Sequence, residues 1–217
     1  MNTRSHSRQS GFTLIELLTV IAIIGILAAI IIPTTGAVRT SAKKAETKTR
    51  FGQWVQAMNL YKQEYGFYAP INRAAYGAAE TNEVNSAAFA AALTGRRLDG
   101  TAFPTAATVA NLFGNKKRMP HYTLSNSDLN ANRTAVIDGF GNANIVVIYD
   151  RNGDGRITTD DLDNGSSPPT VTGDGTGNTT VLNPVTGITA TDGPRTTVVF
   201  YSAGKGTADN DIVYSWK

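Results

Sequence analysis

The sequence predicts an α+β protein in which a long N-terminal helix, part transmembrane and part amphipathic, packs on the small antiparallel β-sheet of a head. Residues 11–33 form an almost unbroken apolar run, and about 20 such residues allow a helix to cross a bilayer. In 51–65, aromatic and aliphatic residues recur every three or four positions, which is typical of one buried helix face. The β-branched runs 144–149 and 196–202 predict strands, and residues 212–216 are expected to pair with the second run.

The two helical segments are expected to form one helix from Phe12 to Tyr65, about 80 Å long. Gly66 predicts its C-terminal cap, whereas Pro33 and Gly36 mark positions where we expect a kink or a local break. The apolar stripe of this helix predicts core packing against the sheet, in preference to a ligand-binding face. It consists of Phe51, Trp54, Val55, Met58, Tyr61 and Tyr65.

Three further features follow the long helix. Residues 85–94 indicate a short second helix that ends at Gly95. From 163 to 194 the composition shifts to Gly, Thr, Asn, Ser and Pro, which predicts a long loop with a weak strand at 180–182. His121 is expected to pack in the core or lie at the surface, because a lone histidine cannot build a histidine-ligand zinc site.

Composition argues against several classes of function. The 217 residues carry a formal net charge of +3 without a tract rich in Lys and Arg, so nucleic acid is not an expected partner. The chain has no cysteine, and it shows no pattern of an enzyme centre, so we expect no catalytic residues. Five bases in the middle of the chain predict a solvated face, with binding of an acidic neighbour as the alternative. They are Arg96, Arg97, Lys116, Lys117 and Arg118.

One acid interrupts the apolar run. Glu16 lies four residues after Phe12, and a carboxylate in hydrocarbon is costly unless it finds a partner. Residues 11–16, GFTLIE, follow a short leader that carries Arg4 and Arg8. This segment resembles the class III signal of type IV pilins and type II secretion pseudopilins.

The resemblance implies how the N-terminus is processed and assembled. It implies that a prepilin peptidase cleaves between Gly11 and Phe12 and that the new N-terminus is methylated. It also implies that the ammonium of Phe12 pairs with Glu16 of a neighbouring subunit in a filament, where pairing relieves two costly charges. A bond within one helix is the alternative partner for Glu16. Pro33 matches the family's proline near the end of the apolar run.

The resemblance also implies a division of the chain and a place in the cell. It places a leader at 1–11, a transmembrane helix at 12–34, the soluble half of the helix at 35–66 and an α+β head, pilin-like in fold, at 67–217. Flanking bases occur on both sides of the anchor, so charge alone does not orient it. The family implies a single-pass inner-membrane protein with a cytoplasmic N-terminus and a periplasmic head.

The implied function is structural. The chain is expected to be a subunit of a type II secretion-type pseudopilus, a homo-oligomeric helical filament that drives protein secretion, and the lack of cysteine favours this class. Its expected partners are the prepilin peptidase, the assembly platform and the lipid bilayer. A type IV pilin of a surface fibre is one alternative, and a membrane-tethered calcium-binding module that never polymerises is another.

Two acidic loops suggest Ca²⁺ as a cofactor. The first has oxygen-bearing residues at the ligand positions of a calcium loop, and Gly155 stands where the sharp turn requires glycine. Its candidate ligands are Asp150, Asn152, Asp154, Arg156 (through its carbonyl) and Asp161. The Asn-Gly and Asp-Gly pairs are also hairpin signals, so a bare hairpin is the alternative.

The second loop, 202–212, resembles the C-terminal calcium loop of major pseudopilins. Ser202, Asp209 and Asp211 match the residues that the family uses there. The loop is short, and Lys205 stands near an expected acid, which weakens binding. We therefore expect the first loop to hold calcium more tightly than the second.

Overall fold

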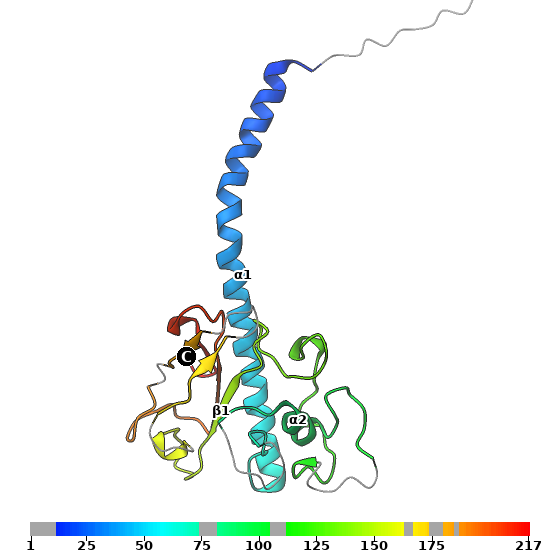
Figure 1. The fold of residues 1–217 in the computed structure, drawn as a ribbon, viewed down its shortest axis with the longest axis vertical. Helices are drawn as coiled ribbons and strands as arrows, with labels where there is room; N and C mark the ends of the chain where they lie inside the picture. Colours follow the sequence, from blue (N-terminus) through cyan, green and yellow to red (C-terminus); the bar gives the residue numbers. More distant parts are fainter. Residues whose placement is uncertain (1–11, 74–81, 105–111, 163–166, 174–179, 185–186) are drawn as a thin grey trace, which may run out of the picture. The chain divides into compact units, whose positions relative to one another are not determined.

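The computed structural model describes residues 12–73, 82–104, 112–162, 167–173, 180–184 and 187–217. The chain divides into two compact units, 1–42 and 43–217, and each is described by itself. The N-terminal helix α1, Leu14–Tyr65, runs through both units (Figure 1).

Helix α1 confirms the long N-terminal helix. It comprises 52 residues and is α-helical throughout, so the break expected near Pro33 and Gly36 does not occur. It ends where the sequence predicts, since Gly66 has φ +82° and its N–H donates to the Lys62 carbonyl at 2.8 Å. A positive φ costs glycine little, because glycine has no Cβ.

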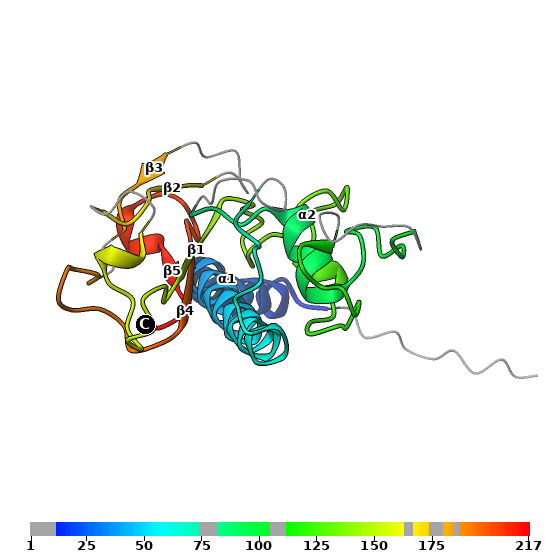
Figure 2. The same cartoon turned by 90° about the horizontal axis from the view of Figure 1, so that it is seen from below.

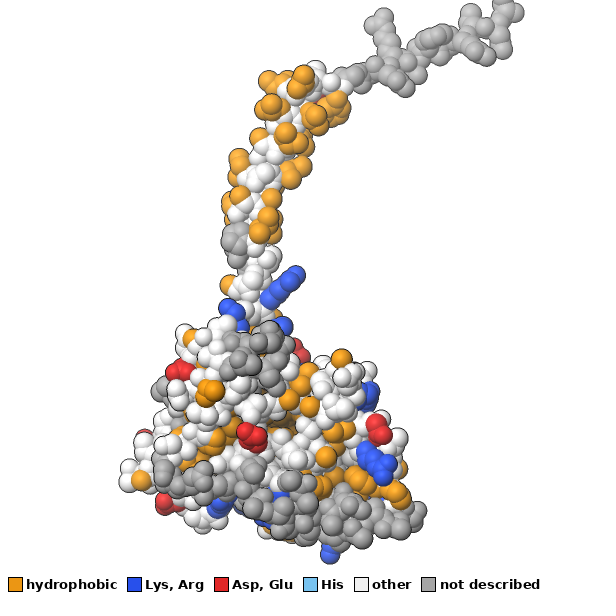
Figure 3. Space-filling view, viewed as in Figure 1, with side chains coloured by type: hydrophobic (Ala, Val, Ile, Leu, Met, Phe, Trp, Pro, Cys, Tyr) orange, Lys and Arg blue, Asp and Glu red, His pale blue; other side chains and the backbone are white. Residues whose placement is uncertain are grey.

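In the first unit, α1 presents its apolar side chains outward (Figure 3). Among the described residues, α1 is the one helix long and apolar enough to cross a membrane, with a mean hydropathy of 2.9 over its most apolar window. A helix that is apolar on all sides and unburied needs an apolar medium around it. This half of α1 therefore fits a lipid environment by length and composition.

In the second unit, the stripe of α1 forms the centre of the core. Phe51, Trp54, Met58 and Tyr61 are fully buried, as the core-packing prediction requires. The Trp54 ring lies 4.8 Å from the ring of Phe89 and also packs against the sheet. Figures 1 and 2 show the sheet on one side of this part of α1 and helix α2 on the other.

The short helix predicted at 85–94 has two parts. Helix α2, Ser86–Phe89, is α-helical, and η1, Ala90–Thr94, continues it as a π-helix. Gly95 ends it with φ +65°, and a Cβ at this position would come within 2.8 Å of the Arg118 backbone. No local sequence pattern indicates the π turn.

The main sheet contains β1 (Ile145–Tyr149), β4 (Val198–Ser202) and β5 (Val213–Tyr214) in the order β1-β4-β5, and both pairs are antiparallel. All three predicted strands are present, with slightly shorter bounds. Both faces of the sheet are buried, because one packs on α1 and α2 and the other on a second cluster that contains Ile157 and Leu162.

A two-stranded sheet lies within the long loop. Strand β3, Val181–Leu182, occupies the predicted weak strand and pairs antiparallel with β2, Val171–Thr172. Val171 and Leu182 are buried in the second cluster. Strand β2 was not predicted, because its two residues are too short a run to show an alternating pattern.

A buried ion pair ties α1 to the segment that precedes the sheet. Arg50 is 4% exposed, and its Nε lies 2.9 Å from Oδ1 of Asp128, the last residue of the 3-10 turn η2 (Asn126–Asp128). The same guanidinium contacts Glu46 at 2.7 Å and donates to the Ile137 carbonyl at 2.6 Å. Because two separate segments converge on Arg50, this contact fixes their position along the helix.

Candidate functional site

The start of α1 carries the residues assigned to assembly. Oε2 of Glu16 accepts the Thr13 N–H at 2.8 Å and the Thr13 hydroxyl at 2.6 Å, and the Glu16 N–H donates back to Thr13 Oγ1 at 3.3 Å. This reciprocal pair is a capping box, which satisfies donors at a helix N-terminus. The motif therefore begins the helix as well as carrying a charge.

The structure describes some of the other N-terminal candidate residues but not all of them. Phe12 is described and is 80% exposed. Gly11 and the leader lie outside the described residues. Pro33 is placed as part of the α1 backbone. In the unprocessed chain, the nitrogen of residue 12 belongs to a peptide bond and carries no charge. Glu16 therefore bonds to Thr13 within its own helix.

The first acidic loop begins directly after β1 and is held by its own side chains. Asp150 accepts the N–H of Gly153 at 2.7 Å and of Gly155 at 3.0 Å. Asp154 Oδ1 accepts the Arg156 N–H at 2.8 Å. Asn152 Oδ1 accepts the N–H of Asp154 at 3.0 Å. These bonds wind residues 150–156 into a compact turn.

Asp161 closes that turn from the other end. It lies in the 3-10 turn η3, Thr159–Asp161, and is 1% exposed. Its two carboxylate oxygens accept the N–H of Arg151 at 2.7 Å and of Thr158 at 2.8 Å. The loop does not close a hairpin, because β1 pairs with β4, about fifty residues further along. The bare-hairpin alternative is therefore wrong.

The first loop fits a calcium ion in its chemistry, since its donors are the hard oxygens that calcium prefers. Among the described residues, however, no three His, Asp or Glu side chains are gathered as metal ligands. Asp150 and Asp161 are buried and Asp154 is exposed. The Arg156 side chain pairs with Asp192 at 3.0 Å; because a guanidinium has no acceptor atom, Arg156 could offer an ion only its carbonyl.

In the second loop, the three residues that resemble the family's calcium ligands form hydrogen bonds with three different partners. The Ser202 hydroxyl donates to Asp138 Oδ2 at 2.7 Å. Asp209 accepts the Asn183 N–H at 2.8 Å, and Asp211 accepts both donors of Thr207. Burial alone raises the pKa of Asp211, but the bonds from Thr207 and two nearby lysines bring that pKa below its usual value.

The partner of Ser202, Asp138, belongs to a buried network of hydrogen bonds. Asp138 is 1% exposed and accepts the N–H of Phe140 at 2.8 Å and of Asn142 at 2.9 Å. The Asn142 side chain also donates to Asp138 and to the Gly204 carbonyl. This network joins the turn before β1 to the end of β4, so Ser202 has a structural bond in place of a free ligand oxygen.

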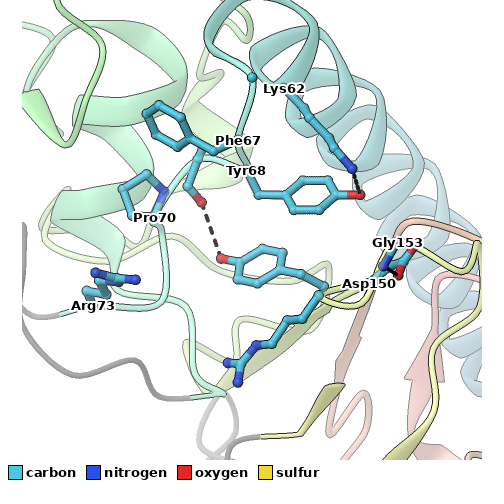
Figure 4. A pocket seen from close by; sticks show the side chains of 11 residues that line it. Lys62, Phe67, Tyr68, Pro70, Arg73, Asp150 and Gly153 are labelled. Carbon is cyan, nitrogen blue, oxygen red and sulfur yellow. Dashed lines mark hydrogen bonds between the residues drawn. The ribbon is translucent and has the colours of Figure 1, made fainter. Parts of the chain in front are cut away.

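A cavity of about 700 Å³ adjoins the first loop (Figure 4). The Tyr68 ring stacks on the Tyr149 ring at 5.4 Å, and the Lys62 ammonium donates to the Tyr68 hydroxyl at 2.8 Å. None of the described residues that line it is Ser, Thr, Cys or His. The end of the long helix, the turn after it and the Asp150 loop thus meet around one opening.

The family model that matches this chain covers an N-terminal segment. Residues 6–32 match the model of the prokaryotic N-terminal methylation motif. The chain is 41% identical over 71 residues to the type IV major pilin protein PilA of Myxococcus xanthus. It is 31% identical over 70 residues to the type II secretion system core protein G of Escherichia coli. It is 42% identical over 88 residues to the fimbrial protein EcpC of Eikenella corrodens.

These matches cover part of each protein. They take in 33%, 32% and 40% of this chain and 30%, 48% and 58% of the relatives, in the same order. No solved structure matches the chain. None of the three relatives is named as an enzyme.

Proposed function

Because the N-terminal segment of this chain is of the prepilin type found in type IV pilins and type II secretion pseudopilins, we propose that the chain is the precursor of a structural filament subunit. In this proposal it is a subunit of a type II secretion-type pseudopilus, with no catalytic role. The observation that carries it is the start of α1, where a single acid caps an apolar helix within the matched methylation motif, one turn from the proposed cleavage position.

In the proposed pathway, prepilin peptidase removes residues 1–11 at the cytoplasmic face of the inner membrane. The new ammonium on Phe12 then lies within reach of Glu16. In low dielectric, an unpaired carboxylate and an unpaired ammonium are each costly. Pairing the ammonium of one subunit with Glu16 of the next relieves both, and it favours a packed helix bundle over isolated anchors.

The continuous α1 supports this mechanism. The same helix carries the apolar, exposed segment and the buried stripe of the head. An assembly platform that moves the anchor therefore moves the head with it, which is how the growth of a periplasmic filament would push cargo outward.

A type IV pilin of a surface fibre is the second candidate. The chain is more similar over its matched part to PilA and EcpC than to core protein G. The absence of cysteine favours the pseudopilin, because many type IV pilins carry a C-terminal disulfide. The location of the filament separates the two candidates.

The function is tested by expressing the full chain in a bacterium with a type II secretion machine. Mass spectrometry should find methyl-phenylalanine at residue 12, and microscopy should find short periplasmic filaments. Gly11→Leu should leave uncleaved precursor in the membrane, whereas Gln9→Leu in the leader serves as the matched control. Long surface fibres would favour the pilin, and a processed chain that never polymerises would contradict both filament candidates.

We also propose that the first acidic loop binds calcium. The spacing of Asp150, Asn152, Asp154 and Asp161 and the oxygen-only donor set support this. These side chains and the Arg156 carbonyl would hold the ion, which would offset the repulsion among their carboxylates. In the second loop, Ser202 is engaged by Asp138, so any binding by Asp209 and Asp211 there would be weaker.

A further inference from the structure

Basic and acidic residues are distributed unevenly along the sequence of the head unit. Residues 84–140 carry more Lys and Arg than Asp and Glu, whereas 141–217 carry more Asp and Glu. The first segment includes α2, and the second contains the whole main sheet. These elements lie on opposite sides of α1 in the head (Figure 2). Among the described residues that are not buried, the α2 flank carries more bases than acids, whereas acids and bases are balanced on the sheet flank, where Asp150 and Asp161 are buried.

The basic flank contains a small pocket lined by three arginines, Arg96, Arg97 and Arg133, called here the three-arginine pocket. Its volume is about 130 Å³, roughly four times the share of one water molecule in the liquid. None of the described residues that line it is acidic. It has room for one carboxylate or one similarly small anionic group.

Each arginine is held in place by a neutral partner. Arg96 donates to the Gly100 carbonyl at 3.2 Å, and Arg133 donates to Asn126 Oδ1 at 2.9 Å. The Arg97 guanidinium lies over the Phe103 ring, 5.6 Å from its centre. These contacts leave the charges of all three uncompensated by an ion pair in the part of the chain that the structure describes.

The positive charges of the three-arginine pocket act on the neighbouring residue Asp99. Hydrogen bonds from Thr101 lower the pKa of Asp99, and the charges of Arg97 and Arg133 add to that effect. Asp99 itself is exposed, and its carboxylate is turned to Thr101, at 2.6 Å from the hydroxyl. A guanidinium is always charged and matches a carboxylate with two parallel donors, so a carboxylate from outside the chain is the fitting occupant.

Among the described residues of the sheet flank, one exposed carboxylate side chain has no partner. Asp160 is exposed in the turn η3, and no hydrogen bond or ion pair joins its side chain to another residue that the structure describes. The other exposed acids nearby have partners: Asp192 pairs with Arg156, and Asp209 accepts the Asn183 N–H. On either side of Asp160, Ile157 and Leu162 are buried against the outer face of the sheet.

We propose that, in the filament proposed above, the three-arginine pocket of one subunit receives Asp160 of the next. A contact between two different surfaces of identical subunits is heterologous and continues from copy to copy, which generates a helical filament when it does not close. The inference rests on the proposed filament and adds the side-by-side contact between heads. An anionic group from another source is the competing occupant.

The test uses engineered disulfides in the full chain, whose lack of cysteine makes each new thiol the only one. Thr123→Cys lines the pocket without removing an arginine, and Thr159→Cys lies beside Asp160 without removing the acid. The two variants are co-expressed, and the filaments are oxidised. We expect a cross-linked dimer only when both are present.

A third change then tests the charge. Adding Asp160→Asn to the Thr159→Cys chain should abolish the dimer, while Asp192→Asn, an exposed acid on the same flank with an internal partner, should leave it. Asp160→Lys should also abolish it, and Arg97→Glu in the other chain should restore it.

Filaments that assemble normally without the cross-link, or with a cross-link that Asp160→Asn does not reduce, would overturn the inference and leave the proposed function standing. Failure of the wild-type chain to form any filament would overturn both. Unchanged melting temperatures of the variants would exclude misfolding as the cause of a lost cross-link.

Discussion

At the scale of single residues, Glu16 has one partner in the structure and another in the proposed filament. Its carboxylate completes a capping box with Thr13, whereas the processed N-terminus would offer it an ammonium. Glutamine also completes a capping box, so Glu16→Gln keeps the helix start and removes only the charge. We expect filament yield to fall sharply in Glu16→Gln and in Glu16→Ala, with membrane insertion and leader cleavage unchanged.

Immunoblots of membranes measure insertion and leader cleavage, and immunoblots of pelleted filaments measure filament yield. Thr13→Ala is the matched control, because it removes the capping hydroxyl and keeps the carboxylate. Wild-type filament yield from Glu16→Gln would show that the charge has no role and that capping alone accounts for the acid.

His121 predicts a pH dependence of stability. Its ring packs against Tyr61 and Tyr65, at 5.4 and 6.0 Å between ring centres. Burial lowers the pKa of His121, and the charge of Glu64, which itself pairs with Lys117, only partly opposes this. Below the unfolded pKa of about 6.5, the unfolded chain binds a proton that the folded chain binds less readily. Stability is therefore full above that pH and declines as the pH falls.

The soluble fragment 43–217 tests this, because His121 is its only histidine. Urea unfolding should give a lower midpoint at pH 5.5 than at pH 7.0. His121→Phe should remove most of that difference. An equal pH effect in the variant would assign it to other groups.

At the scale of elements, the ion pair of Arg50 with Asp128 fixes η2 against α1. Removing one partner leaves a buried, uncompensated charge, which typically costs about 3–5 kcal/mol. We expect Arg50→Met to lower the free energy of unfolding of 43–217 by roughly that amount. Lys48→Met, at an exposed position of the same helix, should change it by no more than about 0.5 kcal/mol. Equal effects of the two changes would contradict the role of the pair.

The first acidic loop predicts an effect of calcium. An ion that binds only the folded state raises stability with its concentration above the dissociation constant. Calcium should therefore raise the melting temperature of 43–217, and magnesium should raise it less, because magnesium demands tighter geometry. Asp154→Ala should remove most of the calcium effect, whereas Asp209→Ala should remove less. A wild-type melting temperature that calcium leaves unchanged would mean that both loops are held by hydrogen bonds alone.

At the scale of the whole molecule, the second unit contains all of the packed core. Both hydrophobic clusters lie within residues 51–214, and the described residues of the first unit contribute none of their members. We expect residues 43–217 to fold without the anchor and to unfold in one cooperative transition, visible as coincident far-UV and near-UV circular dichroism curves. A fragment without near-UV signal would show that the head depends on the membrane segment.

The long helix and the two five-residue strands could be predicted from the sequence. The apolar run, the three-to-four spacing of the stripe and Gly66 determined the long helix and its end, because these signals are local in the chain. The runs of β-branched residues determined β1 and β4 in the same way. The motif at 11–16 determined the class of the N-terminal segment, since its residues act within one helical turn.

Only the tertiary structure decided which distant residues meet. The pairing of β1 with β4 excluded a hairpin at Asp150. The Ser202 hydroxyl donates to Asp138, which lies outside the second loop. The ion pair of Arg50 and the three-arginine pocket each combine residues far apart in sequence. No local pattern marks such contacts, because they depend on how the helix, the sheet and the loops pack around one core.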